Sequence, residues 1–384
     1  MHTVSVVSCP NYEPSTVRAA LLEVLAPLGG LDWVTPGMKI VIKANLVSMM
    51  KPERAATTHP SLLAELVELL CERGAQTVIG DSPGGLYNAV TLNRIYAATG
   101  MHEVEAFGAQ LNHNFEIAQA HFPDAYAAKD FTYTAYLDEA DAIIDFCKLK
   151  SHGMMGMSAA AKNMFGVVPG TTKPEYHFRY PDHTDFARML VDLNRYFEPK
   201  MRLCLVDAVV CMEGNGPTQG TPREVGALLA SPSPHAVDLA CAKIIGVEPE
   251  TIPTLEAAIR EGLIPATVSE LDLHGDLDAV CVEDFENIPT HSGLQFEGYG
   301  KFAATFVRSA LQSRPRPNKK LCIGCKKCAE ICPAKVITMK KGIPHIDTKR
   351  CITCFCCQEF CPVGAMKVHR PWIARLLNRE GKSE

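Results

Sequence analysis

The residues with the clearest chemical potential are the sixteen cysteines, nine of which lie between residues 322 and 361. Eight of the nine form two runs with the spacing Cys-x2-Cys-x2-Cys-x3-Cys-Pro, and the runs are offset by 29 residues. The first is Cys322, Cys325, Cys328 and Cys332, and the second is Cys351, Cys354, Cys357 and Cys361. Thiolates are soft metal ligands, and three of them on one short loop can wrap several metal ions at once.

This spacing is typical of cysteines that bind [4Fe–4S] clusters. Residues 318–370 resemble the bacterial two-cluster ferredoxins, in which the fourth cysteine of each run ligates the other cluster. The resemblance implies two [4Fe–4S] clusters. One would be held by Cys322, Cys325, Cys328 and Cys361, and the other by Cys351, Cys354, Cys357 and Cys332. Zinc is the alternative for a Cys-x2-Cys pair, but two complete runs with Cys-Pro ends fit one tetrahedral ion poorly.

One cysteine of the second run, Cys356, is not needed by the spacing. The simplest interpretation is a small buried residue, and the alternatives are a substitute ligand or a neighbour that tunes the cluster. The seven cysteines outside the runs are scattered over the first 300 residues, so we expect most of them in the core.

A second group of polar residues, in the first 220 positions, would suit an anionic ligand. For proton handling we select Asp81, His152 and His177. For binding we select Lys43, Asn45, Lys148, Lys150, Lys162, Asn163, Lys173, Asp207, Glu213 and Asn215. The Gly-rich segment between Lys162 and Lys173 could cradle an anion through backbone N–H groups, although the P-loop spacing is absent. The simpler interpretation of each residue is a solvated strand end or a turn.

These residues need elements that bring them together. Short apolar or β-branched runs alternate with helical patterns, which favours an α/β domain with a mostly parallel sheet, followed by a small α+β ferredoxin-like domain. The predicted strands are Val4–Ser8, Lys39–Lys43, Thr77–Ile79, Ala142–Cys147 and Leu203–Val206, and the clearest helices are Pro60–Arg73 and Val90–Ala98. Ligands of such sheets bind beyond the carboxyl ends of the strands, where most of the selected polar residues are expected.

The order of these segments resembles the family known as domain of unknown function 362, over about residues 3–300. The segments are Lys43 to Asn45, Thr57 to Pro60, Gly80 to Gly84, Lys148 to His152, Lys162 to Gly166 and Glu213 to Pro217. Members often carry a two-cluster ferredoxin behind this domain, and they frequently have Thr where this chain has Ser151. The resemblance implies an iron–sulfur redox protein and names no substrate.

Charge and composition further limit the classes of function that the chain could have. The chain has 384 residues and a net charge of -5, but residues 301–384 carry a formal +13 and residues 1–300 a formal -18. This split favours docking between the two parts or to an acidic partner, while no nucleic-acid motif accompanies the basic end. No apolar run is long enough to span a bilayer and Met1 to Pro10 lacks a signal-peptide pattern, so we expect a cytoplasmic protein.

The expected organisation is an α/β domain at 1–300, a linker at 301–317, the ferredoxin domain at 318–370 and an amphipathic tail at 371–384. Three functions remain open. The chain could be an oxidoreductase that passes single electrons to an anionic substrate. It could be a carrier that docks on a separate redox partner protein, or a non-redox anion-binding protein with structural clusters.

Overall fold

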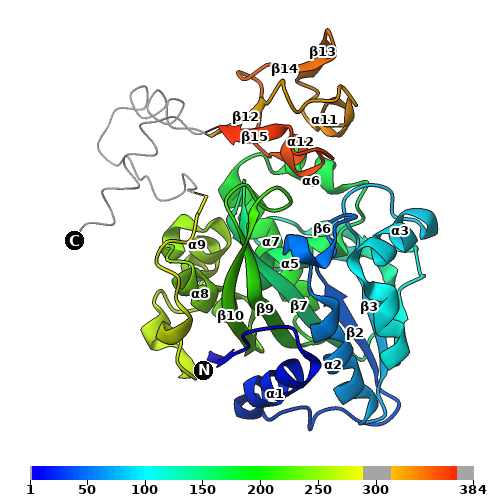
Figure 1. Ribbon diagram of the computed structural model, residues 1–384, viewed down its shortest axis with the longest axis vertical. Coiled ribbons are helices and arrows are strands. Elements are labelled where there is room, and N and C mark those ends of the chain that lie inside the picture. Colours follow the sequence, from blue (N-terminus) through cyan, green and yellow to red (C-terminus); the bar gives the residue numbers. More distant parts are fainter. Residues whose placement is uncertain (1, 289–312, 370–384) are drawn as a thin grey trace.

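The computed structural model describes residues 2–288 and 313–369. The larger part is an α/β domain, and a small module that contains both cysteine runs sits at one end of it, above α6 (Figure 1). None of the helices in these residues is long and apolar enough to cross a bilayer. The proposed tail at 371–384 and most of the linker lie outside the described residues.

The large sheet has the strand order β11-β1-β10-β9-β7-β2-β3-β4, with β8 added to β7. Five of its strand pairs are parallel, and β10 and β8 are the strands that run against their neighbours, which agrees with the predicted mostly parallel sheet. The strands are β1 Thr3–Ser8, β2 Lys39–Ala44, β3 Gln76–Gly80, β4 Ala109–Leu111, β7 Ala142–His152, β8 Gly156–Ser158, β9 Met201–Glu213, β10 Thr221–Ser231 and β11 Asp272–His274. A separate hairpin consists of β5 Ile117–His121 and β6 Asp130–Thr134.

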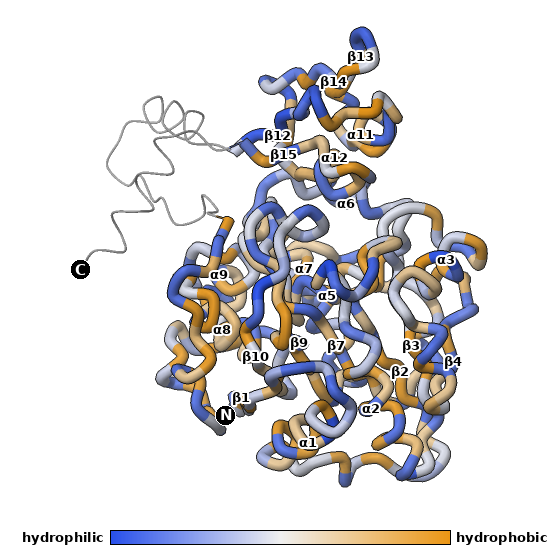
Figure 2. The backbone as a smooth tube through the Cα atoms, in the orientation of Figure 1, coloured by the Kyte–Doolittle hydropathy of each residue, from blue (hydrophilic) through white to orange (hydrophobic). Residues whose placement is uncertain are grey.

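Helices cover both faces of this sheet, so its central strands are buried on both sides. On one face lie α1 Pro14–Leu25, α2 Pro60–Cys71, α3 Ala89–Thr99 and α4 Met101–Val104. On the other lie α5 Ala160–Asn163, α6 Lys173–Arg179, α7 His183–Phe197, α8 Pro234–Ile244 and α9 Pro253–Arg260. Figure 2 shows the hydrophobic colouring along β9 and β2 that this double burial requires.

The sequence-based prediction placed two central strand ends too early. The runs Ala142–Cys147 and Leu203–Val206 were expected to end where polar residues begin, but β7 continues to His152 and β9 to Glu213. The polar residues stay in the strands because they find buried partners on neighbouring elements, which local sequence does not reveal.

The small module has two short antiparallel strand pairs and two one-turn helices. These are β12 Arg314–Pro317 with β15 Met366–His369, β13 Ile337–Lys340 with β14 Ile343–Ile346, α11 Lys327–Ile331 and α12 Cys356–Glu359. The last four residues of the predicted linker thus form a strand of this module, because the extended Pro-rich segment pairs with β15.

Candidate functional site

A hollow of about 640 Å³, counting its open mouth, lies between the α/β domain and the small module. One wall is formed by residues at the carboxyl ends of β2, β3 and β7 and by the segment 158–177. The opposite wall is formed by Cys356 and Glu359 of α12 and by Phe360, which follows it. We call this hollow the interdomain pocket.

Eight of the thirteen residues selected from the sequence line the interdomain pocket. They are Asn45, Asp81, Lys150, His152, Lys162, Asn163, Lys173 and His177. Lys43 lies in the buried network around Asp81 and Asn163, and Lys148, Asp207, Glu213 and Asn215 are also absent from the lining. The topology therefore brings together residues that are up to 132 positions apart, from Asn45 to His177.

Lys148 and Asp207 do not reach the pocket because they lie inside paired strands. Lys148 Nζ is 2.8 Å from Asp207 Oδ2, and both side chains are almost fully buried. The Tyr12 hydroxyl accepts a hydrogen bond from Lys148 and donates one to Asp207. The pair is neutralised internally, so it stabilises the contact between β7 and β9 and leaves no charge for a ligand.

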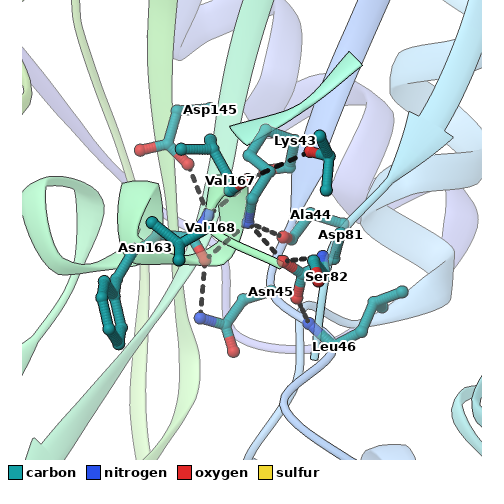
Figure 3. Close-up of polar contacts among 12 residues, drawn as sticks. Lys43, Ala44, Asn45, Leu46, Asp81, Ser82, Asp145, Asn163, Val167 and Val168 are labelled. Carbon is teal, nitrogen blue, oxygen red and sulfur yellow. Dashed lines mark hydrogen bonds and ion pairs between the residues drawn. The ribbon is translucent and has the colours of Figure 1, made fainter. Parts of the chain in front are cut away.

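The pocket floor is a buried polar network that joins β2, β3 and α5 (Figure 3). Lys43 Nζ forms an ion pair with Asp81 Oδ1 at 2.7 Å and also approaches Asn163 Oδ1 at 3.3 Å. Asn45 Nδ2 donates to the same Asn163 oxygen at 2.7 Å. Asp81 additionally accepts the backbone N–H groups of Leu46 and Ser82. With its charge and lone pairs satisfied in this way, Asp81 is held rigidly beneath the pocket.

Asp145, a buried acid at the edge of this network, was not among the residues selected from the sequence. Asn163 Nδ2 donates to Asp145 Oδ1 at 2.5 Å, whereas Asp145 Oδ2 has no hydrogen-bond partner among the described residues. Burial raises the pKa of Asp145 to about 7, partly offset by the nearby Lys43 charge. A lone acid between Ile144 and Phe146 in an apolar strand was the available signal.

Three lysines give the pocket a positive character. Lys150 Nζ donates to Asn45 Oδ1 at 2.7 Å and to the Ala56 carbonyl at 2.6 Å, and burial lowers the pKa of Lys150 to about 7. Lys173 Nζ donates to two backbone carbonyls, and burial likewise lowers the pKa of Lys173 to about 7. Lys162 Nζ lies 4.7 Å from the centre of the Phe165 ring. Within the described part of the chain, none of the three pairs with a carboxylate, so the site suits an anion.

The two pocket histidines are neutral at physiological pH. His152 Nδ1 accepts the backbone N–H groups of Met154 and Met155, both at 3.2 Å, so its ring proton resides on Nε2. Burial lowers the pKa of His152 well below its ordinary value. His177 stacks flat on Phe186 at 4.4 Å, and burial lowers the pKa of His177 to about 3. Both rings can offer hydrogen bonds, but neither is a ready source of protons.

The small module contains two further hollows, each walled by four cysteines. The first is lined by Cys322, Cys325, Cys328 and Cys361, and the second by Cys332, Cys351, Cys354 and Cys357. These are the crosswise sets that the ferredoxin resemblance implies. All the described cysteines are free thiols. The donor type and the grouping therefore fit a [4Fe–4S] cluster in each hollow.

No set of three or more His, Cys, Asp or Glu residues in the described part of the chain is arranged to hold a single metal ion. This is compatible with the two hollows, because four sulfurs around a four-iron cube stand farther apart than four sulfurs around one zinc ion. Cys356 lines neither hollow and lines the interdomain pocket instead. It is buried.

Hydrogen bonds and close packing join the module to the α/β domain next to the pocket. Gln358 Nε2 donates to the Asn215 carbonyl at 2.9 Å, and Asn215 Oδ1 accepts the backbone N–H of Val368 at 3.4 Å. Gly84 faces the Phe360 ring so closely that a Cβ atom there would overlap it. Asn215, selected as a ligand-binding residue, thus contacts the module instead, because the turn after β9 meets α12.

Two family models match the chain. The model described as Domain of unknown function (DUF362) matches residues 40–243, and the one described as 4Fe-4S dicluster domain matches residues 321–365. The chain is also 34% identical, over 276 residues, to a thylakoid-associated protein of Synechocystis. That match covers 70% of this chain and 82% of the relative.

Among solved structures, the apoprotein of lactate racemase from Thermoanaerobacterium thermosaccharolyticum is similar at 14% identity and a TM-score of 0.41. The similarity covers 64% of this chain and 57% of the racemase. A protein from Thermotoga maritima matches at 14% identity and a TM-score of 0.35, over 56% of this chain and 55% of its own. This chain therefore spans little more than half the length of either solved chain.

Proposed function

The chain belongs to the family described as domain of unknown function (DUF362) and carries a 4Fe-4S dicluster domain, and we propose that these two parts form one oxidoreductase. Its substrate is a small anion that binds in the interdomain pocket. The observation that carries this proposal is the composition of the pocket. Three lysines come from the α/β domain, and Cys356, Glu359 and Phe360 come from the second cysteine run.

We assign the eight cysteines of the two hollows as ligands of two [4Fe–4S] clusters. Such clusters, when bound, supply single electrons. Cys354 and Cys357 lie within two residues of Cys356, which lines the pocket, so ligands of the second cluster are close in the chain to the substrate site. This proximity supports electron delivery to a pocket-bound substrate over delivery to a distant site.

The three lysines bind the anion. A partly desolvated ammonium without a carboxylate partner gains charge-assisted hydrogen bonds when an anion enters, and such bonds are the strong ones. Lys162 is the most available, because it has no hydrogen-bond acceptor among the described residues. His152 adds a neutral donor through Nε2, since its Nδ1 is occupied by two backbone N–H groups.

Reduction of an anion also calls for protons, and we assign their delivery to Lys150 or Lys173. A pKa of about 7 suits a general acid at neutral pH. This assignment replaces the proton-handling roles that we predicted for Asp81, His152 and His177. Asp81 is tied to Lys43 and to two backbone N–H groups, and both histidines have lowered pKa values.

The proposal is tested with the full chain, purified and reduced in the absence of oxygen. Small carboxylates and inorganic oxyanions are added one at a time, and the visible absorbance of the clusters reports reoxidation. We expect one class of anion to reoxidise the protein, and Lys162→Gln to slow this reaction by about tenfold or more. Lys129→Gln, at an exposed position of the α/β domain, is the matched control and should react normally.

A neutral quinone serves as the second control, since it accepts electrons without needing the lysines, and it should reoxidise all three proteins equally. If no anion reoxidises the wild-type protein, or if Lys162→Gln reacts as fast, the chain is not an anion reductase. The exposed thiol of Cys325 favours the second candidate in that case, a carrier that docks on a separate enzyme. If no acceptor at all reoxidises the protein, the clusters are structural.

A further inference from the structure

We propose that the face around the first cysteine hollow is the docking surface for a small, acidic, ferredoxin-type electron-carrier protein. This inference goes beyond the proposed function, because it concerns where electrons enter the molecule and not what they reduce. It rests on three observations: exposed apolar side chains at the hollow, lysines around them, and the packing of Phe355, beside the second hollow, in the core of the α/β domain.

Large apolar side chains stand exposed at this face. Ile323 is 65% exposed, Leu321 is 47% exposed and Val363 is 41% exposed. Ile323 and Val363 also line the hollow of Cys322, Cys325, Cys328 and Cys361. Surface apolar residues that surround a cofactor site are typical of contact surfaces, because burying them in a complex is favourable.

Lysines form a rim around these apolar residues. Lys319, Lys320, Lys326 and Lys327 are exposed on the segment that carries the first run. Gly324 packs against Gly342, which brings the exposed turn with Lys340 and Lys341 to the same face. Within the described residues none of these six lysines forms an ion pair, and Glu330 is the exposed acid of the segment. A basic rim around an apolar centre is complementary to an acidic protein surface.

Part of the second hollow is packed against the α/β domain. Phe355 lines that hollow and is also part of the buried core of the α/β domain, and Cys356 faces the interdomain pocket. Electrons that enter at the first hollow would therefore leave on the pocket side. A cluster held by Cys322, Cys325, Cys328 and Cys361 would accept one electron from the reduced carrier. The carrier is oxidised by one electron, and no bond or proton changes place.

Binding is tested with the full-length, cluster-containing protein and an acidic [2Fe–2S] ferredoxin as the probe. We expect an affinity that falls steeply with ionic strength, and a dissociation constant about tenfold or more higher for Lys320→Glu/Lys327→Glu. The control Lys129→Glu/Lys349→Glu changes net charge equally at exposed positions outside this set of six lysines and should bind normally. Ile323→Ser should weaken binding without changing the salt dependence.

A kinetic measurement gives the second readout, without any anionic substrate present. Reduction by the ferredoxin should slow about tenfold in Lys320→Glu/Lys327→Glu, whereas reduction by dithionite should not change. Iron content is measured for every variant. If Lys320→Glu/Lys327→Glu loses iron, the reduction rate of Ile323→Ser tests the proposal in its place. Equal affinity of all variants, or binding that ignores salt, would overturn the proposal. So would a salt-sensitive dimer of the chain that the same substitutions dissociate.

Discussion

Lys150 Nζ donates a hydrogen bond of 2.7 Å to Asn45 Oδ1, so a buried cation at the pocket is held by neutral acceptors. Neither acceptor carries a charge, so the cost of burying the ammonium exceeds the gain from its hydrogen bonds. The pKa of Lys150 therefore falls from 10.5 to about 7. In the free protein the ammonium is destabilised because it lacks a charged partner. An anion that enters the pocket supplies that partner.

Lys150 should contribute a rise in the stability of the protein with pH between about 7 and 10. Across this window the unfolded lysine holds a proton that the folded one has lost, so raising the pH favours the folded state by up to about 1.4 kcal/mol per unit. Urea unfolding at pH 7 and pH 9 should show a smaller rise in the free energy of unfolding for Lys150→Met than for wild type. Lys129→Met should keep the full rise, and an identical slope for both variants would contradict the assignment.

Asp145 should produce the opposite pH dependence in a lower window. Its pKa is raised from 3.8 to about 7, so between these values the folded state binds more protons than the unfolded state. Rising pH therefore weakens the contribution of Asp145 to stability there, by up to about 1.4 kcal/mol per unit. Asp145→Asn cannot ionise, so its free energy of unfolding should improve relative to wild type between pH 5 and pH 7. A constant difference would show that Asp145 is ionised throughout.

Breaking the buried Lys43–Asp81 pair should be costly. Lys43→Met leaves the Asp81 carboxylate buried without its cation, and this typically costs about 3–5 kcal/mol. Lys39 on the same strand pairs with Glu139 at the surface, so Lys39→Met should cost less than about 1 kcal/mol. Denaturant unfolding compares the two. Adding Asp81→Leu to Lys43→Met should recover part of the loss, and similar costs for both single variants would argue against a buried pair.

The contact between Gly84 and Phe360 should control the docking of the small module. Gly84→Leu places a side chain where the Phe360 ring lies, so we expect the module to move away and reoxidation by an anion to slow about tenfold or more. Phe360→Ala in the same chain removes the overlap and should restore the rate in part. Iron content serves as the control and should stay normal. An unchanged rate in Gly84→Leu would show that reoxidation by the anion does not depend on how the module docks.

Cys325, a member of the first run, and Cys356, the extra cysteine within the second, should differ sharply in their effect on iron content. Cys325 lines the first hollow, so Cys325→Ser should lower iron and sulfide toward half of the wild-type content. Cys356 lines the pocket and neither hollow, so Cys356→Ser should retain all the iron. Iron and sulfide analysis of anaerobic preparations measures both. Equal loss in the two variants would mean that Cys356 is a ligand.

Only the first half of β7 could be predicted from the sequence. Its first half, Ala142–Cys147, was predicted because apolar residues favour a strand buried on both faces. Its second half contains Lys148 and Lys150, which look like a solvated strand end. They stay buried because Asp207 and Asn45 meet them from β9 and the end of β2. No local pattern carries that information, since the partners are about 60 and 105 residues away.

The sequence by itself determined the cysteine chemistry and the alternation of strands and helices, because both depend on short-range spacing and on periodic burial. It also selected the three pocket lysines, Lys150, Lys162 and Lys173, of which Lys150 was expected at a strand end. The tertiary structure decided that the pocket is shared, since Cys356, Glu359 and Phe360 reach it only when α12 docks beside Gly84 and Asn215. It likewise decided which lysines keep a free charge, because neutralisation depends on the partners that folding brings near.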